Sequence, residues 1–404
     1  MTLRPVARRL IPSWSERDGQ PFLILRDPDE VMPKAIAVPP IAGLILDLSD
    51  GTRSVAEIAA EGTRIIGREL PKSIVADLVA HLDEAMALEG PRSASALDNL
   101  RREYRSRPRP AALAGTSYPA ARADLADHLS GFGRGDRELP STSDIHVRGV
   151  ISPHIDYQRG GPTYHRVFSR ATPAIRRAKR VIVIGTDHAG GPAHVTPTAQ
   201  DFETPFGTFA ADRQAVARLI HAVGADHAAV DELHHRGEHS IELALNWIAH
   251  AAGDPLPRLV PVLTGSFFPF IRGERAIEQD PRISTAVRVL SDLALDGDTI
   301  VVAAADLAHM GPEFSDPEPL TDALKNQARE ADERLLRAIA WGNADRFLAE
   351  IVAEQDRRHV CGVSPIYLAL RALSPQHGEV VRYDQCPADT AGQSIVTIAG
   401  ALLW

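Results

Sequence analysis

The stretch RVIVIGTDH at residues 180–188 decides the fold, because a run of β-branched residues passes directly into Gly, Asp and His. Such a run is typical of a buried strand that ends in a loop. Two further runs have the same form: VRGVISPH ends at His154, and TIVVAAADLAH ends at His309. Ligands of open α/β sheets bind beyond the carboxyl ends of the strands. His154, His188 and His309 can therefore meet in one pocket, which indicates a metal site, although His154 taken alone is more typical of a histidine bonded to loop backbone.

Strands and helices alternate from residue 113 to the end of the chain. The strand candidates are 148–152, 180–184, 258–263, 299–305, 379–383 and 394–400. The helix candidates are 118–131, 163–171, 212–223, 238–250, 283–295, 319–340, 343–354 and 365–373. This alternation predicts an α/β domain with helices on both faces of a sheet.

Residues 1–92 form a separate small unit in the sequence. The segment PFLILRDPDE predicts a strand and a turn, and IAGLILDLSDG predicts a short helix before an Asp-Gly turn. In RSVAEIAAEGTRII, Ser54 is the expected N-cap and Glu57 completes a capping box. A longer helix is expected in PKSIVADLVAHLDEAMALEG, with Ile74 and Leu78 on its apolar face. Three helices and a strand indicate a winged-helix topology.

This unit resembles the PqqD-like family, whose members are small winged-helix modules that bind peptides in several peptide-modification pathways. The resemblance rests on the strand FLILRDP, the helix end LDLSDG, and the helices RSVAEIAAE and SIVADLVAHLDEAMALEG. It implies a peptide partner for residues 1–92. Nucleic acid is not expected, because Asp77, Asp83, Glu84 and Glu89 make the long helix acidic.

Residues 93–112 are rich in Arg, Pro and Ala and are expected to link the unit to the α/β domain. Five arginines lie between residues 101 and 109. We favour a solvated, extended tether for this segment. The alternative is a patch for an anionic partner.

Composition narrows the classes of function. The 404-residue chain has a net charge of −9, which argues against general nucleic-acid binding. No run of about 18 apolar residues is present, and the basic N-terminus lacks the apolar core of a signal peptide, so no membrane partner is expected. The two cysteines, Cys361 and Cys386, are too few for a disulfide scaffold. We therefore expect a cytoplasmic protein.

Cys361 is the more informative cysteine. It lies just before the predicted helix at 365–373 and close to Arg357, Arg358 and His359. We expect a thiol in this setting to lose its proton readily, and the thiolate is the form that serves a metal or redox chemistry. The alternative is a buried, inert cysteine.

Two further pairs of residues carry candidate chemistry. Asp306 and His309 are three residues apart in AAADLAHMG, so on a helical turn they would face the same way. The pair suits either metal ligation or an acid/base histidine oriented by a carboxylate, and the alternative is that Asp306 only caps a helix. In HHRGEHSIELAL, Gly237 is expected to precede a helix. We therefore expect His239 and Glu242 beside the pocket rather than in a separate zinc site.

Taken in order, a series of motifs resembles the Memo family, whose bacterial members are also called AmmeMemoRadiSam system protein B. The motifs are LAGTSYP at 113–119, ISPHIDY, VIVIGTDHAG, FETPFGTF, GEHSIELAL, VPVLTG, AADLAHMG and CGVSPIYLAL. The Memo fold is similar to that of the class III extradiol dioxygenases, which use non-haem Fe(II). The resemblance therefore implies a three-layer αβα domain over residues 113–404.

The resemblance also implies a metal centre. Its ligands would be His154, His188 and Cys361, with His309 in the position of the dioxygenase acid/base histidine and Asp306 nearby. Fe²⁺ is the expected ion, and copper or zinc are the alternatives that these donors allow.

The chain departs from the family pattern beside the first histidine. The usual PHAGY becomes PHIDY, which puts Ile155 and Asp156 where small residues stand, and Arg159 replaces a common aromatic residue. We expect these substitutions to make the pocket wall more charged. The expected pocket and outer-shell residues are His239, Glu242, Asp187, Tyr157, Asp156 and Arg159.

The favoured function is a metal-dependent redox enzyme that acts on a small molecule, or on a peptide presented by residues 1–92. The first alternative is a non-catalytic scaffold that binds metal and peptide. A zinc hydrolase is the least favoured function, because two histidines and a thiolate are less usual for hydrolytic zinc than His₃ or His₂Glu.

Overall fold

The computed structural model describes residues 4–134, 142 and 145–404. The chain divides into two compact units, Met1–Ser106 and Arg107–Trp404. Among the described residues, no helix is long and apolar enough to cross a membrane.

The first unit combines a three-stranded antiparallel sheet with helices. The strands, in the spatial order β1-β2-β3, are β1 (Ile11–Arg17), β2 (Gln20–Arg26) and β3 (Ile36–Val38). The helices are α1 (Pro40–Leu48), α2 (Val55–Ile66), α3 (Lys72–Glu84) and α4 (Pro91–Ser106). The predicted capping box is present, since the side chain of Ser54 accepts from Glu57 N and Ser54 N donates to the carboxylate of Glu57.

Two sequence-based expectations for this unit are wrong. The buried face of α3 is formed by Val75, Val79 and Leu82, with Leu78 packed beside it, so the expectation fails at Ile74, which is 45% exposed. The segment after residue 92 is not an extended tether, because α4 is a regular helix. Pro91 opens α4, and no further proline interrupts it, so its Ala, Leu, Arg and Glu residues favour the helix.

The second unit contains an eight-stranded mixed sheet. Its strands are β4 (Gly149–Ser152), β5 (Arg180–Thr186), β6 (Thr196–Pro197), β9 (Arg258–Thr264), β10 (Thr299–Ala304), β11 (His309–Met310), β12 (Gly378–Pro387) and β13 (Ile395–Leu403). The spatial order is β11-β13-β4-β10-β5-β9-β6, and β12 pairs with β13. Strands β4, β10, β5 and β9 run parallel, and the other strands pair antiparallel. A separate hairpin is formed by β7 (Phe202–Thr204) and β8 (Gly207–Phe209).

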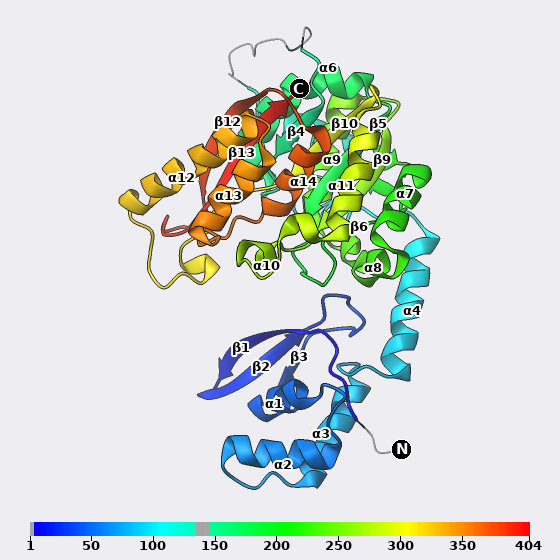
Figure 1. Cartoon of the computed structure of the whole chain (residues 1–404), viewed down its shortest axis with the longest axis vertical. Coiled ribbons are helices and arrows are strands. Elements are labelled where there is room, and N and C mark those ends of the chain that lie inside the picture. Colours follow the sequence, from blue (N-terminus) through cyan, green and yellow to red (C-terminus); the bar gives the residue numbers. More distant parts are fainter. Residues whose placement is uncertain (1–3, 135–141, 143–144) are drawn as a thin grey trace. The chain divides into compact units, whose positions relative to one another are not determined.

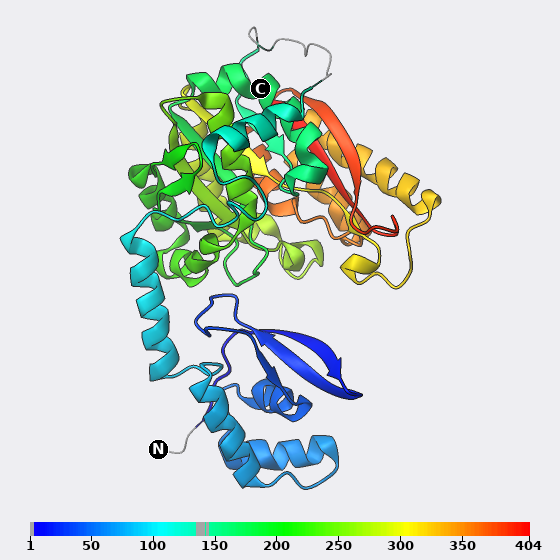
Figure 2. The ribbon, with the colours of Figure 1, turned by 180° about the vertical axis from the view of Figure 1, so that it is seen from behind.

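Helices cover both faces of this sheet. One layer holds α5 (Arg122–Gly131), α6 (Tyr157–Arg177) and α9 (His239–Ala252), which Figure 2 shows in front. The other layer, in front in Figure 1, holds α7 (Arg213–Val223), α11 (Pro281–Ala294), α12 (Asp322–Ala340), α13 (Ala344–Glu354) and α14 (Val363–Leu373). Short helices lie at α8 (Ala225–Val230) and α10 (Phe268–Ile271).

Alternation along the central strands explains the layers. Val181 and Val183 of β5 pack into the core beneath α6 and α9, whereas Ile182 and Ile184 pack into the core beneath α11 and α14. A strand with both faces covered needs apolar residues at every position, which is why these segments read as continuous apolar runs. The expected three-layer α/β architecture is therefore confirmed.

Helix α6 is longer than the sequence suggested. It begins at Tyr157 and includes Gly160, Gly161 and Pro162, residues that argued for a start at 163. The two glycines allow close packing instead. A Cβ on Gly161 would lie 2.3 Å from the ring of Phe132, and one on Gly160 would meet Ile155 at 2.5 Å.

Candidate metal centre

Three neighbouring parallel strands carry the candidate residues to one edge of the sheet. β10 lies between β4 and β5, and the three strands run in the same direction. His154 follows β4, His188 follows β5, and Asp306 follows β10. Because parallel strands end at a common edge, residues from distant parts of the chain meet there.

His154 is buried and held by one ring nitrogen. Its Nδ1 lies 3.0 Å from the carbonyl oxygen of Ala304, and its Nε2 lies 3.2 Å from Sγ of Cys361. Burial and the neighbouring His188 and His239 lower the pKa of His154 well below its usual value. The ring is therefore neutral, with Nδ1–H donating to Ala304 and the Nε2 lone pair facing the thiol.

Glu238 anchors two further histidines. Nδ1 of His188 lies 3.1 Å from both carboxylate oxygens of Glu238, and Nδ1 of His239 lies 3.0 Å from Oε1. Burial disfavours the charge on Glu238, but the two histidines hold its pKa well below the usual value. Burial opposes the charge on His188 as well, yet its bond to Glu238 prevails and raises the pKa of His188. Carboxylates that orient ligand histidines through Nδ1 are typical of metal sites.

The three imidazole rings form a compact group. The ring centroids of His154 and His188 are 4.9 Å apart, those of His154 and His239 are 5.3 Å apart, and those of His188 and His239 are 4.7 Å apart. In each ring Nδ1 has a partner, so Nε2 is the nitrogen left for a ligand. His239, expected beside the pocket, therefore stands as close to the other two rings as they stand to each other.

Cys361 completes the donor group, but as a thiol. Burial and the charge of Asp306 raise the pKa of Cys361 well above its usual value. The expectation of a readily lost proton is therefore wrong for the metal-free site. The nearby cation that was to stabilise the thiolate is not available, because the guanidinium of Arg358 is bound to Asp332 and Glu354.

The donor atoms of His154, His188 and Cys361 fit a metal ion. They all lie within 4.8 Å of one another. Two imidazoles and a sulfur ligand suit iron, copper or zinc, and a bound cation favours the neutral form of His188, which Glu238 opposes in the metal-free site. A bound cation also favours the thiolate form, which offsets the effect of burial on Cys361.

Two further groups of possible ligands lie beside this centre. Glu238 and His239 form one with His188, and Asp187, Asp231 and His234 form the other. In the second group Asp187 Oδ2 lies 2.7 Å from Nδ1 of His234, and all three residues are buried. This hydrogen bond secures the loop that follows β5 and carries His188.

The side chain of Asp306 bonds to the backbone at His154, and it acts on His309 through its charge. Its Oδ1 accepts from the backbone N–H of His154 at 2.8 Å and of Ile155 at 3.3 Å. The expected helical turn is wrong, because residues 305–308 form a loop and His309 opens β11. Nδ1 of His309 lies 3.2 Å from the carbonyl oxygen of Leu307, which fixes the ring in place of Asp306. Burial lowers the pKa of His309, so its ring is neutral near pH 7.

The carboxylate of Glu242 binds Arg109, Tyr118 and the backbone of residues 112–113 rather than the histidine rings. It pairs with the arginine, and it accepts hydrogen bonds from the tyrosine hydroxyl and from both backbone N–H groups. Glu242 therefore lies outside the group of rings, and the carboxylate that contacts the histidines is Glu238, one helical turn earlier.

Three other expected pocket residues have structural contacts. Tyr157 donates its hydroxyl to the carbonyl oxygen of Leu243 at 2.7 Å inside an aromatic cluster. Asp156 caps α6 by accepting from Arg159 N, and its other oxygen pairs with the guanidinium of Arg159 at 2.6 Å. Because the two opposite charges pair with each other, they add no net charge to the site.

Arg109 is a buried residue near the centre that the sequence did not predict. It is 0% exposed, although it was assigned to a solvated linker. Besides Glu242, its guanidinium donates to the carbonyl oxygens of His235 at 2.8 Å and Glu238 at 3.0 Å. Arg109 therefore holds the segment that delivers Glu238 and His239 to the centre.

These features define a mixed α/β protein with a candidate metal centre at the carboxyl ends of its parallel strands. The family model described as "Memo-like protein" matches residues 109–402, and the chain belongs to this family. It is 27% identical to a MEMO1 family protein of Methanopyrus kandleri, over 67% of this chain and 90% of that protein. A relative from Thermus thermophilus is also 27% identical, over 82% of this chain and 93% of its own length. A relative from Aquifex aeolicus is 23% identical over 96% of this chain and 98% of its own length, so the similarity to this relative extends into the first unit.

Proposed function

We propose that the chain is a redox enzyme that uses non-haem Fe(II) held by His154, His188 and Cys361. The observation that carries this proposal is the group of two anchored imidazoles and one thiol within 4.8 Å. Three protein ligands leave positions open for a further ligand, as a catalytic metal requires. Bound iron would supply one-electron chemistry and the activation of a small molecule such as O₂. The likeness of the Memo fold to the class III dioxygenases favours iron over copper and zinc.

His309 is the proposed proton carrier. Its Nδ1 is held by the carbonyl oxygen of Leu307, which leaves Nε2 as the basic atom. Burial keeps the ring neutral, the form that can accept a proton from a substrate. Asp306 fixes the backbone of His154 and thereby keeps the first imidazole in place.

Nitric oxide tests the proposed open position without knowledge of the substrate. The chain is purified without oxygen, loaded with Fe(II) and exposed to nitric oxide, which should give the EPR signal of a high-spin iron nitrosyl. Lack of this signal in an iron-loaded chain would contradict the proposal. Zinc-loaded protein is the control and should be silent.

Oxygen uptake then separates an enzyme from a scaffold. With a panel of catechols and pooled peptides, the iron-loaded chain should consume O₂ faster than the zinc-loaded chain. The His309→Gln variant should keep the nitrosyl signal and lose uptake, because only the proton carrier is removed. Iron loading with no uptake from any member of the panel would favour a non-catalytic scaffold, and hydrolysis by the zinc form would favour a hydrolase.

We also propose that the first unit binds a peptide. A groove of about 460 Å³ lies between β1, β2 and α1, and its wall includes Leu10, Trp14, Leu25 and Leu44. Trp14 is 67% exposed, an unusual position for a large aromatic side chain. Apolar surface of this kind suits the side chains of an extended or helical peptide.

Peptide display tests the groove. Random peptides selected on the full chain should include clones that lose binding to a Trp14→Ser variant. A Trp341→Ser variant is the matched control, since Trp341 is also exposed, at 55%, but lies in the second unit. Selected clones that bind both variants equally would contradict a role for the groove. Iron content should be unchanged in both variants.

A further inference from the structure

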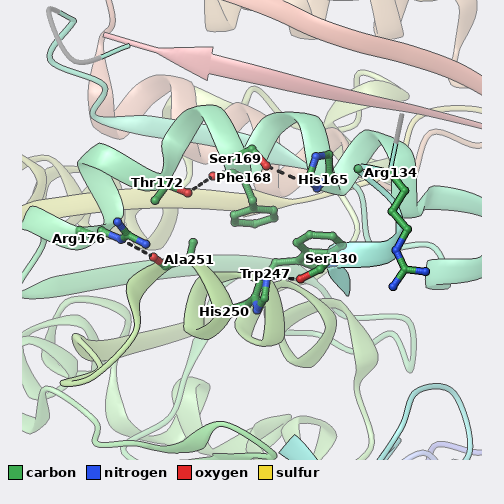
Figure 3. A pocket seen from close by; sticks show the side chains of 11 residues that line it. Ser130, Arg134, His165, Phe168, Ser169, Thr172, Arg176, Trp247, His250 and Ala251 are labelled. Carbon is green, nitrogen blue, oxygen red and sulfur yellow. Dashed lines mark hydrogen bonds between the residues drawn. The ribbon is translucent and has the colours of Figure 1, made fainter. Parts of the chain in front are cut away.

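A second cavity lies between α6 and α9, at the opposite end of α9 from the metal centre. His239 opens α9 and His250 lies near its end, so the two are about 16 Å apart along the helix axis at 1.5 Å per residue. The cavity encloses about 320 Å³, and its wall includes side chains from α5, α6 and α9 (Figure 3). This volume is at the lower end of the usual range for ligand pockets, about 300–1,000 Å³, and fits a molecule with one ring.

The polar side chains of this cavity are arginines, histidines and hydroxyl residues. Arg134, Arg176, His165 and His250 lie in its wall with three hydroxyl residues, and none of the described residues that line it carries a carboxylate. This is unusual in a chain whose net charge is −9. Among the residues that the structure describes, no carboxylate pairs with Arg134 or Arg176. A cavity with uncompensated guanidinium groups favours an anion.

Arg176 is placed to bind such an anion. Its Nε donates to the carbonyl oxygen of Ala251 at 3.1 Å, which ties the guanidinium to the end of α9. The terminal nitrogens remain available for a carboxylate or phosphate, which guanidinium binds through paired hydrogen bonds. Figure 3 shows Arg176 and Arg134 at opposite ends of the cavity, with Phe168 and Trp247 between them.

The wall between the two arginines is aromatic. Trp247 stacks on Phe168 with centroids 6.1 Å apart and an interplanar angle of 11°. Its Nε1 is buried and has no hydrogen-bond partner within the described part of the chain. His165 and His250 meet the indole at steep angles, 65° and 88°. Burial and the nearby His165 lower the pKa of His250.

We infer that this cavity is a binding site for a small aromatic anion, with the charged group on Arg176 and the ring against Phe168 and Trp247. We infer an aromatic ring in the ligand because the middle of the cavity is lined by aromatic side chains. We infer a negative charge because arginines stand at both ends of the cavity. The site is independent of the proposed metal chemistry, since none of its residues belongs to the metal centre.

Fluorine NMR of the full chain, labelled with 5-fluorotryptophan, tests the inference. Phenyl phosphate is the probe, and the Trp247 resonance is assigned by its loss in a Trp247→Phe variant. Titration should shift this resonance, and an Arg176→Gln variant should bind at least tenfold more weakly. Arg177→Gln is the matched control, because it removes the same charge from the next residue of α6, which does not line the cavity, and it should leave binding unchanged.

Two companion probes separate the ring from the charge. Inorganic phosphate and benzyl alcohol should each bind at least tenfold more weakly than phenyl phosphate. Equal binding of inorganic phosphate would show a simple ion site, and equal binding of benzyl alcohol would show an apolar cavity, and either result overturns the inference. Equal weakening by the Arg176→Gln and Arg177→Gln variants would overturn it as well.

Discussion

The Cys361→Ala variant is expected to lose its metal. Sγ of Cys361 lies 3.2 Å from Nε2 of His154, and both atoms belong to the three-donor group with His188. Even outer partners of ligand histidines change metal affinity by about 10–100-fold when they are substituted, so loss of a ligand should cost at least as much. After anaerobic purification, mass spectrometry should find wild-type chain with bound iron or copper and the variant nearly empty. A His154→Ala variant should behave in the same way.

A matched cysteine provides the control. Cys386 is buried and Cys361 partly buried, but Sγ of Cys386 lies 3.7 Å from the carbonyl oxygen of Arg159, outside the three-donor group. The Cys386→Ala variant should keep the metal content of the wild type. Circular dichroism would establish that each variant is folded, so that metal loss is not the result of unfolding. Equal metal content in the wild type, Cys361→Ala and His154→Ala would refute the ligand assignment.

The strands that position the centre could be predicted from the sequence because their signal is local. Each central strand is a short apolar run, and His154 and His188 stand at the ends of two of them. The carboxyl ends of neighbouring parallel strands lie at one edge of the sheet, so the meeting of these two residues needs only the fold class. Cys361 does not end a strand; its position before a helix made it a candidate for metal or redox chemistry, but its place beside the two histidines depended on the family resemblance.

The remaining site residues could not be predicted because their roles depend on distant partners. Glu238 and Glu242 lie one turn apart in the same motif, and nothing local tells which one faces the histidines. The structure assigns Glu238 to His188 and His239, and it assigns Glu242 to a segment more than 120 residues earlier. The same reason explains Arg109, because a charged residue in a Pro-rich segment reads as exposed until its buried partner is known.

The Arg109→Met variant should lose about 3–5 kcal/mol of the free energy of unfolding, the usual cost of removing one partner of a buried ion pair. The side chains of Arg109 and Glu242 are 0% and 1% exposed. The substitution leaves the Glu242 carboxylate in the core without its cation. It also removes the donors to the carbonyl oxygens of His235 and Glu238. Urea unfolding of the second unit, followed by near-ultraviolet circular dichroism, measures the loss.

A second substitution distinguishes the stranded charge from the lost packing of Arg109. Glu242→Gln removes the charge but keeps an oxygen for the backbone of Ala112 and Leu113, so Arg109→Met/Glu242→Gln should recover part of the stability lost in the single variant. Arg213→Met is the surface control. Its pair with Asp201 is 64% exposed on the arginine side, and such pairs contribute about 0–1 kcal/mol. If Arg109→Met cost no more than Arg213→Met, Arg109 would not hold the segment that carries Glu238 and His239, and another contact would have to keep these residues at the metal centre.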